Sequence, residues 1–266
     1  MRGSMTAALC LAAWAVPARS QAPERGYCPA RPGLGTPACT IAPGRVSVEI
    51  GIATWERTDG AGARTDAIVA GDTLLRVGLT DSVEALIGWT PFGRVRFRNA
   101  AGVVDTATRS GDVLIGAKAN LRNPDGGGFS VAVQPFATLP VGRAPVGAGD
   151  WSAGVVAPMS YDLDDTLNLQ FSPQVDAAAD GDGRGRHLAY SGTLGLGVLV
   201  AEGVGVTFEV QAARDRAPDG ASAPLLGAVS AGWAPAADQQ IDVGATLGLN
   251  RDAPDLQLYF GFSQRL

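Results

Sequence analysis

The sequence has 266 residues, of which 46% are hydrophobic and 18% are charged, and its formal net charge is −5. The acidic balance and the lack of a Lys/Arg stripe argue against nucleic acid as a partner. The regularly patterned apolar content excludes a disordered chain, and no apolar run reaches the roughly 18 residues of a helical membrane span. The length suits one all-β domain of about 220 to 250 residues.

Residues 1–20 have the three parts of a secretory signal peptide. Arg2 gives the positive start, residues 5–16 form a short apolar core, and residues 18–20 form a small-residue cleavage site. Cleavage before Gln21 removes two arginines, so the net charge changes from −5 to −7. We therefore expect the chain to be exported.

Residues 21–44 form a segment rich in proline and glycine that contains Cys28 and Cys39. The periplasm is oxidising, so a structural disulfide between them is the preferred interpretation. The loop that this bond would close is short, and the expected gain in stability is at most about 3 kcal/mol. Two cysteines without a nearby histidine do not indicate a metal site, and we expect neither a metal nor a cofactor.

From residue 45 to residue 266, segments of alternating apolar and polar residues are each ended by Gly, Asp, Asn or Pro. A period of two indicates strands with one apolar and one polar face. Their lengths match the roughly 9 to 11 residues with which a tilted strand crosses a bilayer. The twelve predicted strands are 45–56, 67–79, 83–92, 112–122, 129–140, 151–162, 166–178, 188–200, 204–214, 224–234, 239–249 and 255–266.

The alternation is clearest in the ninth predicted strand and in the last one. In the ninth, Val206 and Phe208 fall on one parity and Glu209 falls on the other. The last strand ends the chain on the apolar Leu266, and an apolar final residue is typical of the closing strand of an outer-membrane barrel. Gln264 departs from that pattern, because it occupies a position on the apolar parity.

The connections alternate in length as well. Those after even-numbered strands are tight, such as 80–82 and 201–203, and most after odd-numbered strands are longer, such as 57–66 and 93–111. The short connection 250–254 is the exception. Short periplasmic turns opposite longer external loops are typical of an outer-membrane barrel with both chain ends in the periplasm.

A soluble barrel or sandwich with an apolar interior would show the same period of two. However, the apolar parity carries almost no charge along the twelve strands and would overfill a soluble barrel. Aromatic residues also lie on this parity near strand ends, where an interfacial girdle belongs. These residues are Trp89, Trp151, Tyr161 and Trp233. The predicted fold is therefore all-β, a transmembrane antiparallel up-and-down β-barrel of about twelve strands over residues 45–266.

Charged residues on the polar parity are the candidate lumen or pore residues. They are Glu49, Arg76, Glu84, Lys118, Arg122, Asp176, Glu209 and Asp242. In one interpretation, members of opposite charge pair across the interior and brace the barrel. In the other, they form a constriction that selects solutes by charge and size. The sequence leaves both interpretations open.

Catalysis in such a barrel would have to use His187, the only histidine in the sequence. It closes a loop rich in Gly, Arg and Asp, with no serine at the spacing of a nucleophile and its base. A solvated loop histidine is the preferred interpretation. Asp180 and Asp182 in the same loop do not continue into the acidic spacing of a calcium loop. We predict no catalytic residue, no metal ligand and no enzymatic activity.

Residues 28–55 and 243–266 together resemble the outer-membrane transporter family named after the meta-pathway of phenol degradation. The paired cysteines and the turn at 250–255 (NRDAPD) are the specific matches, whereas the ending with Gln264 and Leu266 departs. The resemblance implies a barrel of about twelve strands and passive uptake of small aromatic or other apolar compounds. It supplies no catalytic or substrate-binding residues.

The expected function is that of a channel or transporter in the cell outer membrane for passive uptake of small compounds. Its expected partners are outer-membrane lipid, a small-molecule solute and, during insertion, the barrel-assembly machinery. Two alternatives stay open. Segment 21–44 would plug the lumen of a structural or assembly barrel, or the barrel would be a lipid-modifying enzyme that uses His187.

Overall fold

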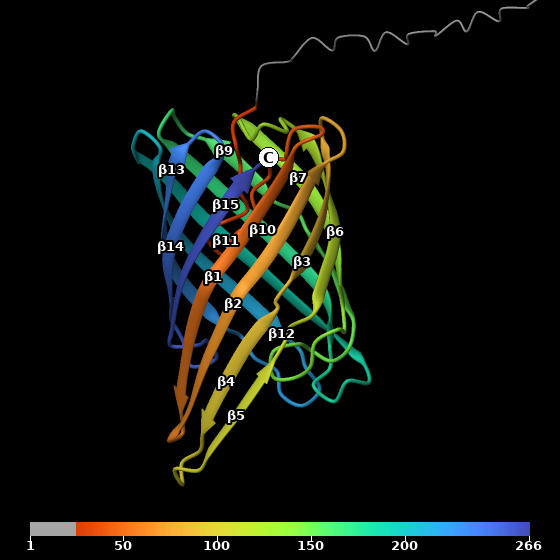
Figure 1. The fold of residues 1–266 in the computed structure, drawn as a ribbon. Coiled ribbons are helices and arrows are strands. Elements are labelled where there is room, and N and C mark those ends of the chain that lie inside the picture. Colours follow the sequence, from red (N-terminus) through yellow and green to blue (C-terminus); the bar gives the residue numbers. More distant parts are fainter. Residues whose placement is uncertain (1–24) are drawn as a thin grey trace, which may run out of the picture.

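The computed structural model describes residues 25–266, and from Val46 onward these residues form antiparallel strands joined by turns and loops (Figure 1). The predicted signal peptide, residues 1–20, lies outside the described residues. Within 25–266 no helix is long and apolar enough to cross a membrane. The strands are β1 (Val46–Gly60), β2 (Ala63–Gly78), β3 (Val83–Trp89), β4 (Phe92–Arg98), β5 (Val104–Arg109), β6 (Val113–Arg122), β7 (Phe129–Leu139), β8 (Ser152–Val156), β9 (Met159–Asp162), β10 (Leu167–Ala179), β11 (Arg186–Ala201), β12 (Val204–Asp215), β13 (Leu225–Ala236), β14 (Gln239–Gly248) and β15 (Leu256–Arg265).

These strands occupy twelve positions in the wall of a closed barrel, which confirms the predicted fold. Consecutive positions pair antiparallel, and β1 pairs with both β2 and β15, which closes the sheet. Three positions are each shared by two shorter strands. One position is shared by β3 and β4, which both pair with β2. The next is shared by β6, which pairs with β3, and β5, which pairs with β4. The third is shared by β8 and β9, which both pair with β7 and β10.

Prolines explain two of the three shared positions. Pro91 lies between β3 and β4, and Pro158 lies between β8 and β9. A proline has no N–H group to donate to the neighbouring strand, so the hydrogen-bond ladder is interrupted there. The third break, between β5 and β6, falls at residues 110–112 and contains Gly111.

The two ends of the barrel differ in their connections. The described part of the chain begins and ends at the same end, where tight turns such as 80–82 and 201–203 also lie (Figure 1). We call this the turn end and the opposite one the loop end. Aromatic residues on the outer face lie near both: Trp89 and Trp151 toward the loop end, Tyr161 and Trp233 toward the turn end. All four are about half exposed, as a girdle requires.

Large apolar side chains cover the outer face of the barrel, and a cluster of charged side chains is buried inside it. Phe208 and Val243 are 52% and 55% exposed. By contrast, Arg76, Lys118 and Glu49 are among the largest fully buried side chains. A soluble barrel has the opposite arrangement, because its interior is packed with apolar side chains. The alternative of a soluble barrel or sandwich is therefore wrong.

Two of the predicted loops are instead mostly strand. β1 and β2 continue to Gly60 and Ala63, so the expected loop 57–66 is reduced to a turn at Ala61 and Gly62. Both residues have positive φ (51° and 78°), as the two-residue turns that match strand twist require. Most of the expected loop 93–111 forms the hairpin of β4 and β5, which projects past the rest of the loop end (Figure 1).

Candidate functional site

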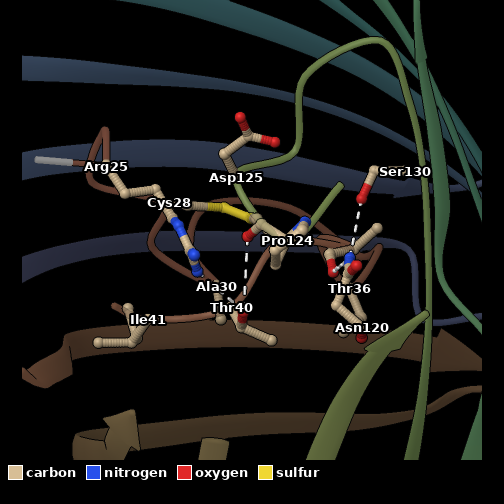
Figure 2. The surroundings of a disulfide bond; sticks show 12 residues. Arg25, Cys28, Ala30, Thr36, Thr40, Ile41, Asn120, Pro124, Asp125 and Ser130 are labelled. Carbon is tan, nitrogen blue, oxygen red and sulfur yellow. Dashed lines mark hydrogen bonds between the residues drawn. A yellow bond between two sulfur atoms is a disulfide. The ribbon is translucent and has the colours of Figure 1, made fainter. Parts of the chain in front are cut away.

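Residues 25–44, which we call the plug, lie inside the lumen at the turn end (Figure 1). Ala38, Cys39, Thr40 and Ile41 are at most 4% exposed. The predicted disulfide between Cys28 and Cys39 is present, with Cα atoms 6.5 Å apart. Figure 2 shows this bond beside the turn between β6 and β7, where the amide of Thr40 donates to the carbonyl of Pro124 at 3.0 Å.

Three carboxylates of the wall accept hydrogen bonds from plug backbone amides. Glu49 Oε2 accepts from Ala30 at 2.8 Å and from Arg31 at 3.2 Å. Glu84 Oε2 accepts from Ile41 at 2.7 Å. A carboxylate is a strong acceptor, so these bonds satisfy plug amides that have left the solvent.

The third carboxylate, Glu209, holds the middle of the plug from β12. Its two oxygens accept from the amides of Leu34 at 2.8 Å and Gly35 at 2.7 Å. Gly33 allows the Glu209 carboxylate to approach these two amides. It has a φ of 113°, and a Cβ added there would lie 2.6 Å from Glu209 Oε2. A larger residue would therefore both strain the backbone and displace the carboxylate.

Plug carbonyls are held by donors on β2 and β6, in the same part of the wall as Glu49 and Glu84. Arg76 Nη1 donates to the carbonyl of Cys28 at 2.7 Å, and Lys118 Nζ donates to that of Cys39 at 3.3 Å. Asn120 Nδ2 donates to the carbonyl of Ala38 at 2.8 Å. Acidic side chains thus bind the amides of the plug, and basic or amide side chains bind its carbonyls.

The same charged groups also pair with one another. Arg76 lies 3.0 Å from Glu49 and 2.9 Å from Glu84, and Lys118 lies 3.3 Å from Glu84. The side chains of these four residues are at most 1% exposed. Such burial is tolerated because each charge has both an opposite charge and further hydrogen-bond partners.

A further ion pair fixes the loop-end side of the plug. Arg31 Nη2 lies 3.0 Å from Asp242 Oδ1, and the carbonyl of Arg31 accepts a bond of 2.7 Å from Gln240 Nε2. The guanidinium carbon of Arg31 also lies 5.7 Å from the centre of the Tyr259 ring. Asp242 and Tyr259 belong to β14 and β15, so this contact ties the plug to the strands that complete the barrel.

Six of the eight predicted lumen residues therefore meet around the plug: Glu49, Arg76, Glu84, Lys118, Glu209 and Asp242. Asp176 also lies on the inner wall, where it accepts hydrogen bonds from Gln174 Nε2 at 2.9 and 3.0 Å. It is not bonded to the plug.

Arg122 does not lie in the lumen. The pairing of β6 with β7 shifts by one residue between Asn120 and Arg122, and this bulge turns Arg122 to the outer face. There its guanidinium lies 5.5 Å from the centre of the Phe129 ring. Strict alternation placed Arg122 inside, because a bulge has no clear signal in the sequence.

Several residues at the plug were not singled out by the sequence. Asn120 and Ser172 lie on the inward parity but carry no charge, and Ser172 Oγ bonds both the amide and the carbonyl of Thr36 at 3.0 and 2.9 Å. Arg31 lies in the plug itself. Asn120 and Ser172 share the inward-facing parity with the charged candidates, so the sequence does contain a signal for them. Nothing in the sequence indicates the position of Arg31.

The described residues line two cavities, of which the smaller contacts the plug. The one on its loop-end side has a volume of about 350 Å³. It is lined by plug residues 31–34 and by Thr54, Val69, Asp72, Thr90, Gln257 and Tyr259 of the wall. The other, of about 650 Å³, lies at the turn end and is lined by residues of β9 to β12 and their turns. The smaller cavity therefore leaves room for a small molecule beside the plug, on its loop-end side.

His187 lies at the loop end and is not the solvated loop residue that was expected. It is the second residue of β11, beyond the lipid-facing Leu188, and its side chain is 8% exposed. Nδ1 is hydrogen-bonded to Asp180 Oδ1 at 2.7 Å. Nε2 lies 2.7 Å from Asp215 Oδ1, without hydrogen-bond alignment. Both ring nitrogens thus face carboxylates.

This environment predicts a pH dependence. The Asp180 carboxylate, which accepts a hydrogen bond from the charged imidazole, raises the pKa of His187 above its ordinary value. The stability that the charged imidazole contributes is complete below about pH 6.5, the unfolded pKa, and is lost as the pH rises through the higher folded pKa. An NMR titration of the single histidine is expected to show this raised pKa, and Asp180→Asn is expected to lower it. A wild-type pKa at or below the ordinary value would contradict the assignment.

The closed barrel with charge inside and apolar side chains outside is the fold of outer-membrane channels. It matches an outer-membrane channel from Pseudomonas putida F1 with a TM-score of 0.69 and 15% identity, covering 92% of this chain and 99% of that one. It matches the NanC porin with 0.52 and 11%, covering 83% and 100%, and the KdgM porin with 0.53 and 7%, covering 82% and 98%.

The chain belongs to the family described as "Putative MetA-pathway of phenol degradation", whose model matches residues 30–266. This match confirms the resemblance at residues 28–55 and 243–266 and extends it across the whole barrel. A comparison with curated proteins finds no match.

Proposed function

We propose that the protein is a passive channel of the outer membrane for small compounds with one aromatic ring. In this proposal the protein reaches the outer membrane after export through a cleaved signal peptide. The fold of outer-membrane channels, the apolar outer face and the aromatic residues near both ends support the location. The description of the family, with its reference to phenol degradation, supports the class of solute. The protein itself performs no chemistry in this proposal.

The observation that carries the proposal is the cavity of about 350 Å³ on the loop-end side of the plug. An apolar cavity of about 150 Å³ is enough to hold benzene in another protein. Here Val69, Leu34 and the ring of Tyr259 offer apolar surface, while Asp72 and Thr90 offer polar groups for a ring hydroxyl. This mixture suits a compound such as phenol, which has one apolar ring and one polar group.

Current measurements in planar bilayers with phenol as the probe test this function. Phenol is expected to cause brief current blocks whose frequency rises with its concentration. Val69→Trp, which fills the cavity, is expected to reduce these blocks severalfold. Val243→Trp is the matched control, because Val243 is 55% exposed on the outer face. Phenol dissolved in the bilayer is expected to affect both variants equally. Blocks of equal frequency in all three proteins would contradict the cavity as the solute site.

The alternative function, a structural or assembly barrel with a plugged lumen, is consistent with the presence of the plug. The same bilayer recordings distinguish that barrel from a channel. A barrel whose plug serves only to brace the wall would carry no ion current, with or without phenol. The lipid-modifying enzyme is disfavoured for a different reason. A general base needs one ring nitrogen directed at its nucleophile, whereas both nitrogens of His187 face carboxylates.

A further inference from the structure

Three arginines occupy alternate positions of β4 and face the outer side of the barrel. Arg94, Arg96 and Arg98 are all exposed, and they follow Phe92, which is 42% exposed on the same side. Side chains two residues apart on a strand share a face and are about 7 Å apart. β4 and its partner β5 form the hairpin that projects beyond the loop end (Figure 1). We call the three residues the arginine ladder.

The strand register shows which face the arginine ladder occupies. Arg94 lies opposite Ile68 of β2, which is 44% exposed and lies in turn opposite Trp55 of β1. Directly opposed residues of an antiparallel pair point to the same face. The alternate face belongs to the lumen, because Gly93 lies opposite Val69, a residue of the 350 Å³ cavity. The arginine ladder therefore continues the outer face of the barrel.

The carboxylate directly opposite the arginine ladder is already engaged. Asp66 lies opposite Arg96, but it accepts hydrogen bonds from Arg64 at 2.7 and 2.9 Å and from Arg57 at 3.2 Å. The bond from Arg64 holds the pKa of Asp66 below its usual range, so this carboxylate stays ionised and stays committed to its two partners.

The arginine ladder has no internal counter-charge. Among residues 25–266, no hydrogen bond or ion pair engages the guanidinium groups of Arg94, Arg96 or Arg98. By contrast, Arg186 at the loop end pairs with Asp150 at 2.8 Å. Three neighbouring positive charges in a chain with a net charge of −5 point to an external anion.

The height of the arginine ladder indicates where that anion lies. Arg94 is level with Trp55 and Ile68 in the register, at the edge of the apolar outer face. Arg96 and Arg98 lie about 7 and 14 Å farther along the strand. A lipid head-group layer is about 5 to 7 Å deep on each side of the hydrocarbon core. The arginine ladder thus begins at the edge of the hydrocarbon core and runs through this layer on the lipid-facing side of β4, with Arg98 beyond it.

We propose that the arginine ladder binds the phosphorylated head group of the glycolipid in the outer leaflet, the lipid A class. A guanidinium group matches a phosphate with two parallel N–H···O bonds, and a site at the membrane surface is partly screened from water. The proposal rests on the outer-membrane location, but it is independent of what passes through the lumen.

Native mass spectrometry of the purified full barrel in detergent tests the site. The variant is the triple change Arg94→Gln, Arg96→Gln and Arg98→Gln, with Arg96→Gln alone as a milder second variant. The control is Arg143→Gln, Arg184→Gln and Arg251→Gln, which removes the same charge from exposed loop residues. The probes are bisphosphorylated lipid A, monophosphorylated lipid A, phosphatidylethanolamine and inorganic phosphate.

Wild-type protein is expected to bind bisphosphorylated lipid A more tightly than the other two lipids, and the ladder variant to bind it at least about tenfold more weakly. The control variant is expected to bind like the wild type, and inorganic phosphate is expected not to displace the lipid. Unchanged binding by the ladder variant, an equal loss in the control, or displacement by inorganic phosphate would overturn the proposal. The phenol blocks of the ladder variant are expected to match the wild type, so failure of this site and failure of the channel function are distinguishable.

Discussion

Arg76→Leu is expected to lower the free energy of unfolding by about 3 to 5 kcal/mol, the cost of removing one partner from a buried ion pair. The arginine side chain is 0% exposed and lies within 3.0 Å of both Glu49 and Glu84. Without it, two buried carboxylates face each other with only Lys118 to offset them, and the plug carbonyl of Cys28 loses its donor. The substitution therefore acts on the wall and the plug together.

Urea unfolding in detergent micelles, followed by tryptophan fluorescence, measures this loss as a lower midpoint. Arg251→Leu is the matched control, because it makes the same chemical change in an exposed turn and is expected to alter the free energy by less than about 0.5 kcal/mol. Equal midpoints for Arg76→Leu and the control would show that the charge network around the plug contributes nothing to stability.

Removal of residues 25–41 is expected to raise the single-channel conductance severalfold while leaving the barrel assembled. The sheet begins at Val46, so no strand is shortened. The plug is bound at Glu209 on one side of the lumen and at Glu84 on another, and its removal frees the space between them. Conductance depends on the width of the water path, which the plug narrows.

Planar-bilayer recordings measure this effect, and circular dichroism checks that the sheet content is retained. The double change Cys28→Ser and Cys39→Ser is an informative intermediate, since it removes the disulfide but keeps every hydrogen bond to Glu209 and Glu84. We expect its conductance to stay near the wild-type value. If the shortened chain conducts no better than the wild type, the plug is not the constriction.

The barrel could be predicted because lipid on one side and charge on the other impose alternation on every strand. Phe208 and Glu209 are neighbours in sequence, and the structure places them on opposite faces, the first exposed and the second buried. The aromatic residues near strand ends follow the same rule. A period of two is local, so a single sequence is enough to read it.

The plug contacts and the strand irregularities could not be predicted in the same way. The amide of Leu34 and the carboxylate of Glu209 are separated by 175 residues, and no local pattern links them. The bulge before Arg122 shifts the alternation by one residue. The hairpin of β4 and β5 differs from the expected loop 93–111 because Arg94, Arg96 and Arg98 occupy the outward parity of β4, where the other strands carry apolar residues.

The contacts of the plug have a consequence for the order of assembly. Arg31 belongs to the first described part of the chain, yet its carboxylate partner Asp242 lies 211 positions later, on the penultimate strand. During insertion into the membrane, Arg31 therefore lacks this ion-pair partner until β14 is in place. Closing so long a span is slow, because the entropy of the intervening chain must be lost first. Docking of the plug in the lumen and pairing of β1 with β15 are thus expected to occur together, late in the assembly of the barrel.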